Sequence, residues 1–315
     1  MHPSRYLRHV LLLCGLIVSS ARVQAAPSPP QVLTAPVAAE LEHLRTLTDN
    51  RAYSAALDLI EQLLPHAANP SFDLAVLSQV KGQVLLAEAR YDIALAPLQL
   101  AAELGERHGF FDKNTRLATM FLLGQLHAQL AAITTSGTSV NRQHNLARAL
   151  DYARRWQAQS LRPSAEVQLF IASTLYQTAM LDPAKPDLAQ LELALKAAAE
   201  SLFLENTPRE ASYVVLLASQ QQLGQREASA DTLELLVKAH PATGVYWHQL
   251  AGTYLTLAAA APDPVSVSRY QLRALLTLER AQALGHLMTA QDQATVLALR
   301  AALAAPVSVT ATAAY

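Results

Sequence analysis

The segment GVYWHQLAGTYLTL at residues 244–257 echoes the segment ASYVVLLASQQQLG at residues 211–224. Tyr213 and Trp247 occupy the same place in the two segments and are 34 residues apart. In both segments large apolar residues recur every three or four positions, which is the spacing of one face of a helix. A helical unit that returns after a fixed interval of about 20 to 50 residues predicts a stack of repeats rather than a single compact core.

The composition favours helices along the rest of the chain. Hydrophobic residues make up 51% of the 315 positions, aromatic residues only 6%, and alanine and leucine dominate. Alanine and leucine lose little side-chain entropy in a helix. Runs rich in valine, isoleucine, threonine and aromatics with a period of two, which would indicate strands, are missing. We therefore expect an all-α fold.

Short breaks of proline, glycine and polar residues divide the chain into helical segments of similar length. The segment from Thr289 to Asp292 offers a capping pattern for the last of them. The expected helices are 37–48, 51–65, 71–89, 91–107, 113–132, 143–160, 164–181, 186–205, 209–223, 226–240, 243–259, 266–284 and 289–303.

These segments resemble the tetratricopeptide repeat, a helical hairpin with a bulky aromatic, a leucine and a small residue in its first helix and alanines in its second. The resemblance covers roughly residues 50 to 285 and implies an α-α superhelix, or solenoid, of about six hairpins plus a C-terminal capping helix. The residues that match the repeat spine are Gly82, Tyr91, Ala94, Gly124, Tyr213, Leu216, Trp247, Leu250, Ala251, Tyr254, Ala274 and Ala281.

Within this pattern we expect degenerate hairpins over 37–205 and better-matching repeats with the capping helix over 206–303. Small residues of the spine would let the two helices of a hairpin approach closely, and stacked hairpins would bury the faces that one hairpin cannot bury alone. An insertion from Ala259 to Arg269 separates the two helices of the last hairpin and departs from the repeat pattern.

The first 25 residues have the pattern of a secretory signal peptide. A basic start with Arg5 and Arg8 precedes the apolar run 10–18, and a cleavage site follows that ends at Ala25. The run is too short to span a bilayer, which needs about 20 apolar residues. The pattern predicts a periplasmic or secreted protein with no transmembrane segment after cleavage.

Two further features follow from this expected cleavage. Cys14 is the chain's one cysteine, so the mature chain would contain none, which suits an oxidising compartment. Four prolines within 26–36 indicate an extended tether after the cleavage site, and 304–315 would form a C-terminal tail.

The net charge and the absence of known catalytic motifs limit the classes of function that the sequence allows. Loss of Arg5, Arg8 and Arg22 would leave 21 basic residues against 25 acidic ones, with no basic cluster, so nucleic acid is excluded as a partner. Zinc-protease, phosphate-loop and nucleophile-elbow motifs are absent from the sequence. We expect no catalytic residues, no metal site and no cofactor.

The concave surface of a helical stack is lined by the first helix of each hairpin. Glutamine recurs there and offers amide donors and acceptors without charge, which could bind an extended peptide; the alternative is ordinary solubilising polarity. The expected contact residues are Gln79, Gln83, Gln125, Gln129, Gln221, Gln222 and His248.

The last repeat, with Pro241, the run Tyr246-Trp247-x-Gln249-Leu250-Ala251-Gly252-x-Tyr254 and then Leu278-Glu279-x-Ala281, is similar to the envelope repeat proteins associated with TonB systems. That resemblance implies a non-enzymatic periplasmic scaffold or adaptor, accessory to TonB-dependent outer-membrane transport, whose partner is a protein or peptide of the cell envelope. Two alternatives remain: an assembly or chaperone factor for outer-membrane proteins or polymers, and a helical accessory domain of a peptidoglycan-acting enzyme. The sequence assigns no oligomeric state.

Overall fold

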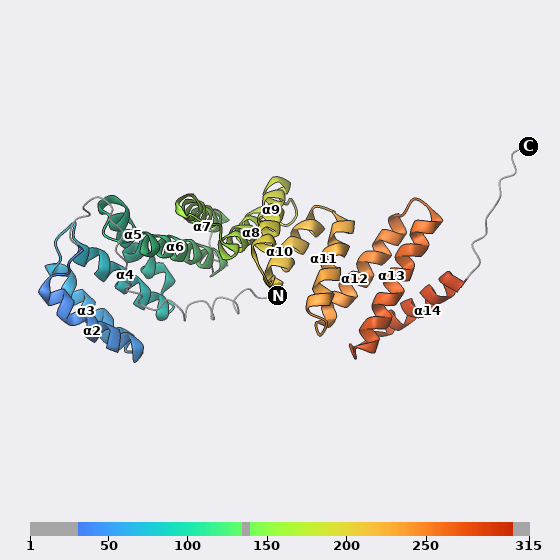
Figure 1. Ribbon diagram of the computed structural model, residues 1–315, viewed down its shortest axis with the longest axis horizontal. Helices are drawn as coiled ribbons and strands as arrows, with labels where there is room; N and C mark the ends of the chain where they lie inside the picture. Colours follow the sequence, from blue (N-terminus) through green and yellow to red (C-terminus); the bar gives the residue numbers. More distant parts are fainter. Residues whose placement is uncertain (1–30, 134–138, 305–315) are drawn as a thin grey trace, which may run out of the picture. The chain divides into compact units, whose positions relative to one another are not determined.

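The computed structural model describes residues 31–133 and 139–304 (Figure 1). Over these ranges it contains α-helices and one short 3-10 helix, and no strand. The expected signal peptide, residues 26–30 of the expected tether and residues 305–315 of the expected tail lie outside the described residues. The chain divides into two compact units, residues 1–161 and 162–315. The all-α expectation is confirmed.

Unit 1 contains three helical hairpins, each made of two helices that follow one another in the sequence. The helices are α2 (Ala35–Asp49) and α3 (Tyr53–Leu63), which runs into the 3-10 helix η2 (Leu64–His66); then α4 (Phe72–Ala87) and α5 (Tyr91–His108); and then α6 (Lys113–Ile133) and α7 (Ser139–Gln159).

Unit 2 contains three more hairpins and one helix that packs against the last of them. The helices are α8 (Ala165–Ala179) and α9 (Leu188–Leu204), α10 (Glu210–Gln222) and α11 (Arg226–Ala239), α12 (Gly244–Ala260) and α13 (Pro264–Ala283), and finally α14 (Ala290–Ala304). Six hairpins and a C-terminal capping helix therefore make up the described part of the chain, as the repeat pattern predicts.

Several helices, among them α4, α8, α9 and α13, begin at a side chain that accepts a hydrogen bond from a free backbone amide. The hydroxyl of Ser71 accepts from the amide of Leu74 at the start of α4, and the carboxylate of Asp263 accepts from Ser266 at the start of α13. The capping pattern expected for the last helix is also present, since Thr289 and Asp292 each accept from the other's backbone amide, at 3.1 and 2.8 Å.

Two boundaries differ from the sequence expectation. Helix α2 begins at Ala35, because proline is tolerated in the first turn of a helix, where its missing N–H is not needed; the expected tether therefore stops at Thr34. The insertion 259–269 is largely helical rather than a break. It extends α12 to Ala260 and starts α13 at Pro264.

The predicted spine residues mostly lie inside the two units. Tyr91 and Tyr213 are half-buried, and so is Leu216, because the adjacent Leu217 takes the core position at 5% exposure. The buried face of α10 is therefore shifted by one residue from the face that the repeat pattern predicts. The buried spine residues are Gly82, Ala94, Gly124, Trp247, Leu250, Ala251, Tyr254, Ala274 and Ala281.

A close approach between helices explains one of the small residues. A methyl group added at Gly82 of α4 would lie 2.3 Å from Cγ of Leu98 on α5. The two helices of this hairpin therefore fit together only because position 82 carries no side chain. Ala94 and Leu98 are fully buried at the same contact.

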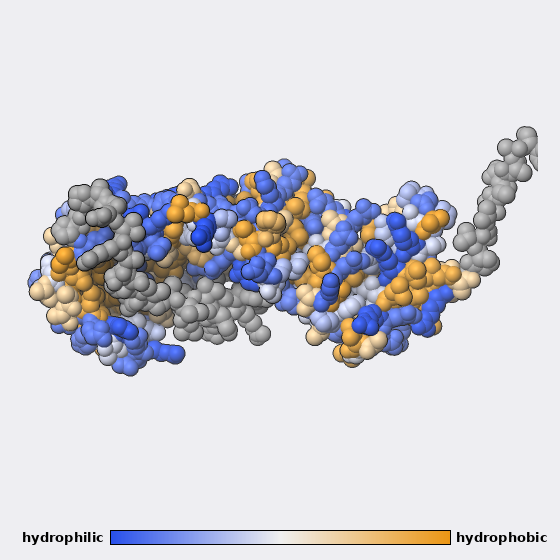
Figure 2. Space-filling model, viewed as in Figure 1, coloured by the Kyte–Doolittle hydropathy of each residue, from blue (hydrophilic) through white to orange (hydrophobic). Residues whose placement is uncertain are grey.

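Over 31–133 and 139–304, no helix combines the length and the hydropathy that crossing a membrane requires. On the face drawn in Figure 2, hydrophilic residues cover much of both units and are interrupted by hydrophobic patches. Single exposed leucines contribute to the apolar surface, such as Leu272 at 46% and Leu276 at 53% exposure on α13. Scattered apolar residues of this kind are usual on protein surfaces.

Candidate functional site

The predicted contact residues of unit 1 lie on the first helices of its second and third hairpins. Gln79 and Gln83 belong to α4, Gln125 and Gln129 to α6, and all four are half-buried. The side-chain amide of Gln79 donates to the hydroxyl of Thr119 at 3.5 Å, which joins α4 to α6. Gln79 is thus partly engaged in contact between neighbouring hairpins.

The predicted contact residues of unit 2 differ from one another. Gln221 and Gln222 are exposed in the last turn of α10, whereas the neighbouring Gln220 is buried and accepts a hydrogen bond from Thr232 at 2.9 Å. His248 is half-buried, and its Nδ1 lies 3.5 Å from Oδ1 of Asp292 on α14. His248 therefore contacts the capping helix and is not a free side chain on a binding surface.

The electrostatics at this contact favour a charged Asp292. Its partial burial alone would raise the pKa of the carboxyl group, but hydrogen bonds from the side chain and backbone of Thr289, together with the nearby His248, outweigh burial and hold the pKa below its ordinary value. Among the residues that the structure describes, no group of three or more histidines, cysteines, aspartates or glutamates could hold a metal ion.

The structure contains a polar pocket that the repeat pattern does not predict. It has a volume of about 230 Å³ and lies in unit 2, between the second helices of the last two hairpins. Glu227, Ala230 and Asp231 of α11 form one wall, Arg269, Tyr270 and Arg273 of α13 form the other, and Tyr254 and Leu257 of α12 form the floor.

Two polar bridges join the walls of this pocket. The hydroxyl of Tyr270 donates to Oε1 of Glu227 at 2.9 Å. The second bridge is centred on Glu234, about two turns further along α11 than Glu227. Glu234 accepts a hydrogen bond from the hydroxyl of Tyr254 and lies 3.7 Å from the guanidinium of Arg273.

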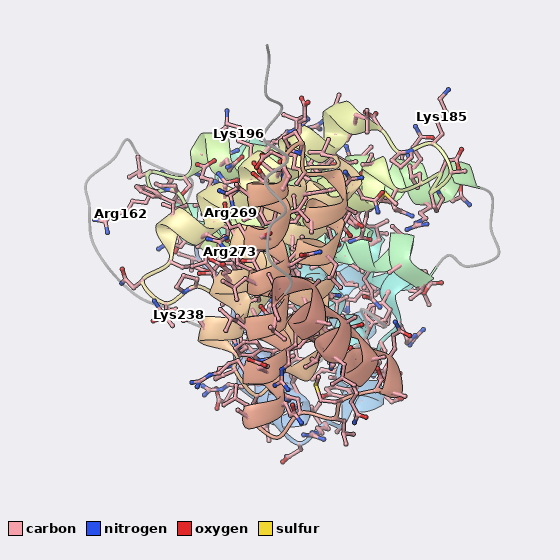
Figure 3. The ribbon with its side chains drawn as sticks, turned by 90° about the vertical axis from the view of Figure 1, so that its right-hand side faces the viewer. Arg162, Lys185, Lys196, Lys238, Arg269 and Arg273 are labelled. Atoms are coloured by element: carbon pink, nitrogen blue, oxygen red, sulfur yellow. The ribbon has the colours of Figure 1, made fainter. Side chains whose placement is uncertain are left out.

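Each arginine of the pocket lies over a tyrosine ring. The guanidinium carbon of Arg269 is 4.8 Å from the ring centroid of Tyr270, and that of Arg273 is 5.5 Å from the centroid of Tyr254. The two rings are themselves stacked, at 6.4 Å. Cation-π contacts of this kind fix the direction of an otherwise flexible arginine. Figure 3 shows the two arginines on the same side of α13.

The tyrosine of the floor acts as a hydrogen-bond donor. Burial is the main reason that the pKa of Tyr254 is raised, and the hydrogen bond to Glu234 and its negative charge raise it further. The hydroxyl therefore keeps its proton throughout the physiological range. Because both tyrosine hydroxyls donate their single proton to glutamates, they join the walls and have no further proton to donate to a ligand.

The two remaining charged side chains of the pocket are exposed. Asp231 forms no hydrogen bond or ion pair with the described residues. Arg269 lies over the ring of Tyr270, and its positive charge adds to the hydrogen bonds from Ser266 that lower the pKa of Asp263.

Sequence reasoning missed this site because Tyr254 matched the repeat spine, and because the insertion 259–269 was interpreted only as a departure from the repeat pattern. The residue spacing could have indicated it. Two acidic residues, Glu227 and Asp231, are four positions apart and so share one helix face, and the same holds for the basic residues Arg269 and Arg273.

No family model and no curated protein matches this sequence. Solved structures with a similar fold do match. The S. pombe nuclear import adaptor Nro1 matches with a TM-score of 0.50 and 13% identity, over 90% of this chain and 99% of Nro1.

Two tetratricopeptide repeat proteins also match. The protein YrrB, described as having an unusual peptide-binding site, has a TM-score of 0.46 and 12% identity, over 77% of this chain and 97% of its own. The C-terminal part of a repeat protein from Cytophaga hutchinsonii has a TM-score of 0.48 and 9% identity, over 83% of this chain and 93% of its own. The match to Nro1, at a TM-score of 0.50, agrees with the all-α stack of helical hairpins described above.

Proposed function

We propose that this protein is a non-enzymatic scaffold that binds other proteins or peptides and acts in the periplasm. The observation that carries the binding role is the polar surface of the first helices, where half-buried glutamines in unit 1 and exposed glutamines in unit 2 offer amide donors and acceptors. A stack of hairpins presents such groups over an extended surface, which suits a peptide better than a small molecule.

The sequence supports the more specific parts of the proposal. The N-terminal pattern up to Ala25 and the lack of cysteine beyond Cys14 support a periplasmic location. The pattern around Trp247 in the last hairpin supports a role beside TonB-dependent transport through the outer membrane. Both parts predict that the partner is a protein of the cell envelope.

Crosslinking in intact cells tests the binding role directly. A photoreactive amino acid is placed at Gln125 in unit 1 or at Gln221 in unit 2, and the matched control carries it at Lys196, an exposed residue on the second helix α9. We expect the same envelope protein to be captured from the glutamine positions and not from Lys196. Equal capture at all three positions, or none at the glutamines, would contradict the proposal.

A paired substitution separates binding from stability. Because Gln221 and Gln222 are exposed, replacing both with alanine should change the free energy of unfolding by no more than about 0.5 kcal/mol, while lowering partner capture.

Osmotic shock, which releases periplasmic proteins from cells, tests the proposed location. We expect the protein to be released, and its retention with cytoplasmic proteins would contradict the periplasmic assignment.

A further inference from the structure

We infer that the outward face of α14 pairs two copies of this protein, with the α14 helices of the two copies packed antiparallel against each other. The inference goes beyond the proposed role in partner binding, because the occupant of this face is a second copy of the chain. It is carried by the fold of unit 2, in which α14 is the one described helix outside a hairpin, and by the spacing of the apolar residues that α14 leaves exposed.

The first and last described helices differ in their exposed faces. The exposed residues of α2 include Glu42, His43, Arg45 and Asp49, whereas those of α14 are mostly alanine, with one leucine. Figure 2 shows hydrophobic residues gathering over α14. The end of a repeat stack normally needs a polar outer face, because no further repeat covers it. Helix α2 has such a face and α14 does not.

The exposed apolar residues of α14 follow the spacing of a coiled-coil seam. Ala290, Ala294, Leu297, Ala301 and Ala304 are all exposed, and the steps between them alternate between four and three residues. This alternation places them on one stripe of the helix, opposite the side that packs in the core of unit 2. A stripe with this spacing fits the matching stripe of another helix. The face therefore favours a helical occupant.

The one large side chain of this seam lies at its centre. Leu297 is the eighth of the 15 residues of α14 and is 66% exposed. In an antiparallel pair of identical helices, each Leu297 would lie over a small residue of the second copy, Ala294 or Ala301. Large side chains facing small ones let two helices interdigitate without collision. The same face can thus serve both copies about a two-fold axis.

The charges of α14 are already engaged within unit 2. Asp292 accepts from the backbone amide of Thr289 and lies 3.5 Å from His248, and Arg300 donates to Glu279 at 2.6 Å. No charged residue lies on the seam itself. An identical seam therefore approaches without meeting a like charge, whereas a strongly charged partner segment would find no free charge to pair with.

The size of the face makes the pairing weak. Helix α14 is about 22 Å long at 1.5 Å per residue, and one helix pair of this length buries less than the roughly 1,200–2,000 Å² of a stable interface. Leu287, in the segment just before α14, is 92% exposed and adds apolar surface at the start of the helix. We therefore expect a reversible dimer that forms as the protein concentration rises.

Sedimentation velocity of the full chain tests the inference. Over about 1 to 200 µM protein, the sedimentation coefficient should rise from that of a monomer toward that of a dimer. Leu297→Glu would bury a carboxylate of each copy in the apolar seam, so it should raise the dissociation constant of the dimer at least about tenfold. The matched control is Ala39→Glu, which adds the same charge to the exposed face of α2 and should leave the dissociation constant unchanged.

Cysteine crosslinking tests the antiparallel arrangement, in a chain whose one cysteine, Cys14, is replaced by serine. Ala290 and Ala304 are the two ends of α14, about 21 Å apart along the helix axis. A short bis-maleimide linker should therefore join Ala290→Cys chains to Ala304→Cys chains in a mixture. Neither variant alone should be joined to itself beyond the level seen with Ala39→Cys.

The inference is overturned if the wild-type chain stays monomeric over the whole concentration range, if Leu297→Glu dimerises like the wild type, or if Ala290→Cys alone is crosslinked as readily as the mixture. Circular dichroism at low concentration checks folding, and at this exposed position we expect an unchanged melting temperature. The crosslinking result remains decisive if Leu297→Glu does not fold.

Failure of this inference is distinct from failure of the scaffold role. A wild-type monomer that still captures its envelope partner at Gln221 would dismiss the pairing alone. A wild-type monomer whose capture at Gln221 is lost in Leu297→Glu would assign the face of α14 to that partner and not to a second copy. A dimer with no capture at Gln125 or Gln221 would keep the pairing and dismiss the scaffold.

Discussion

The indole nitrogen of Trp247 donates a hydrogen bond to the backbone carbonyl of Pro241 at 3.0 Å. Nε2 of His286 lies 2.8 Å from the same carbonyl, so the start of α12 and the segment that follows α13 meet at one acceptor. Trp247 is only 8% exposed and packs in the core of unit 2. The aromatic of the repeat pattern thus fills the core and also fixes the turn between two hairpins.

Replacing Trp247 with alanine should therefore destabilise unit 2 strongly. The loss of a large buried ring costs about 3–5 kcal/mol, and denaturant unfolding monitored by circular dichroism measures it. Trp247→Phe keeps one buried aromatic ring but loses the hydrogen bond and part of the indole volume, so it should cost less than alanine, about 1–2 kcal/mol. Equal losses in the two variants would show that the bond to Pro241, and not burial of the ring, stabilises this region.

Two glycines in first helices should respond to alanine in opposite directions. At Gly82 an added methyl group would lie 2.3 and 2.6 Å from side-chain atoms of Leu98, and overpacking of this kind costs about 1–3 kcal/mol. At Gly252 no atom lies within 4 Å of the added group, so alanine should stabilise α12 by about 0.5–1 kcal/mol through its higher helix propensity. Thermal unfolding of both variants checks the signs, and stabilisation by Gly82→Ala would mean that α4 and α5 are not in close contact.

The fold could be predicted from the sequence because its determinants are local. Helix periodicity, proline and glycine breaks and the capping residues act within a few positions, and they place the helices of both units within a few residues of their observed bounds. The limit of this reasoning is shown in α10, where Leu217 is buried in the core although the repeat pattern predicts Leu216 there. A shift of one residue rotates a helix by about 100°, and packing against α11 and α12, not the sequence period, settles which leucine turns inward.

The candidate site could be predicted far less well because its contacts are distant in sequence. Nothing near His248 indicates that Asp292, on the capping helix, lies 3.5 Å away. Nothing in the repeat pattern indicates that Glu227 and Tyr270, 43 residues apart, form one end of a pocket. Such pairs follow from the stacking of hairpins, and Arg269, the last residue of the insertion 259–269, falls outside the repeat pattern used to align them.

Buried His127 should make unit 1 less stable as the pH falls. The residue is 2% exposed, its Nδ1 lies 2.9 Å from Oδ1 of Asn145, and its Nε2 is buried without a hydrogen-bond partner. Burial lowers the pKa of His127 below 6.5; the hydrogen bond to Asn145 opposes this effect, and the nearby charges of Arg148 and His144 add to it. Protonation would leave a buried N–H without an acceptor.

The sign of this effect follows from proton binding. Below pH 6.5 the unfolded chain protonates this histidine while the folded protein does not, so the free energy of unfolding declines from pH 6.5 down to the lowered pKa of the folded state. Urea unfolding at several pH values between about 5 and 8 measures the slope. His127→Asn should flatten it, whereas His66→Asn, at an exposed histidine, should not. An unchanged slope in His127→Asn would assign the pH dependence to other groups.

The capping helix α14 should depend on one face for its attachment. Val296 and Leu299 are 7% and 5% exposed in the core of unit 2, whereas Leu297 between them is 66% exposed. Leu299→Ala should therefore cost about 2–5 kcal/mol, and Leu297→Ala on the same helix no more than about 0.5 kcal/mol.

Charge contributes less than burial to this attachment. The guanidinium of Arg300 donates to Glu279 at 3.0 and 2.6 Å, but the arginine side chain is 58% exposed. Water and salt weaken such a pair, so Arg300→Ala should cost about 1 kcal/mol or less. Hydrogen exchange of the α14 amides measures all three variants, and faster exchange in Leu297→Ala than in Leu299→Ala would show that α14 docks on the opposite face.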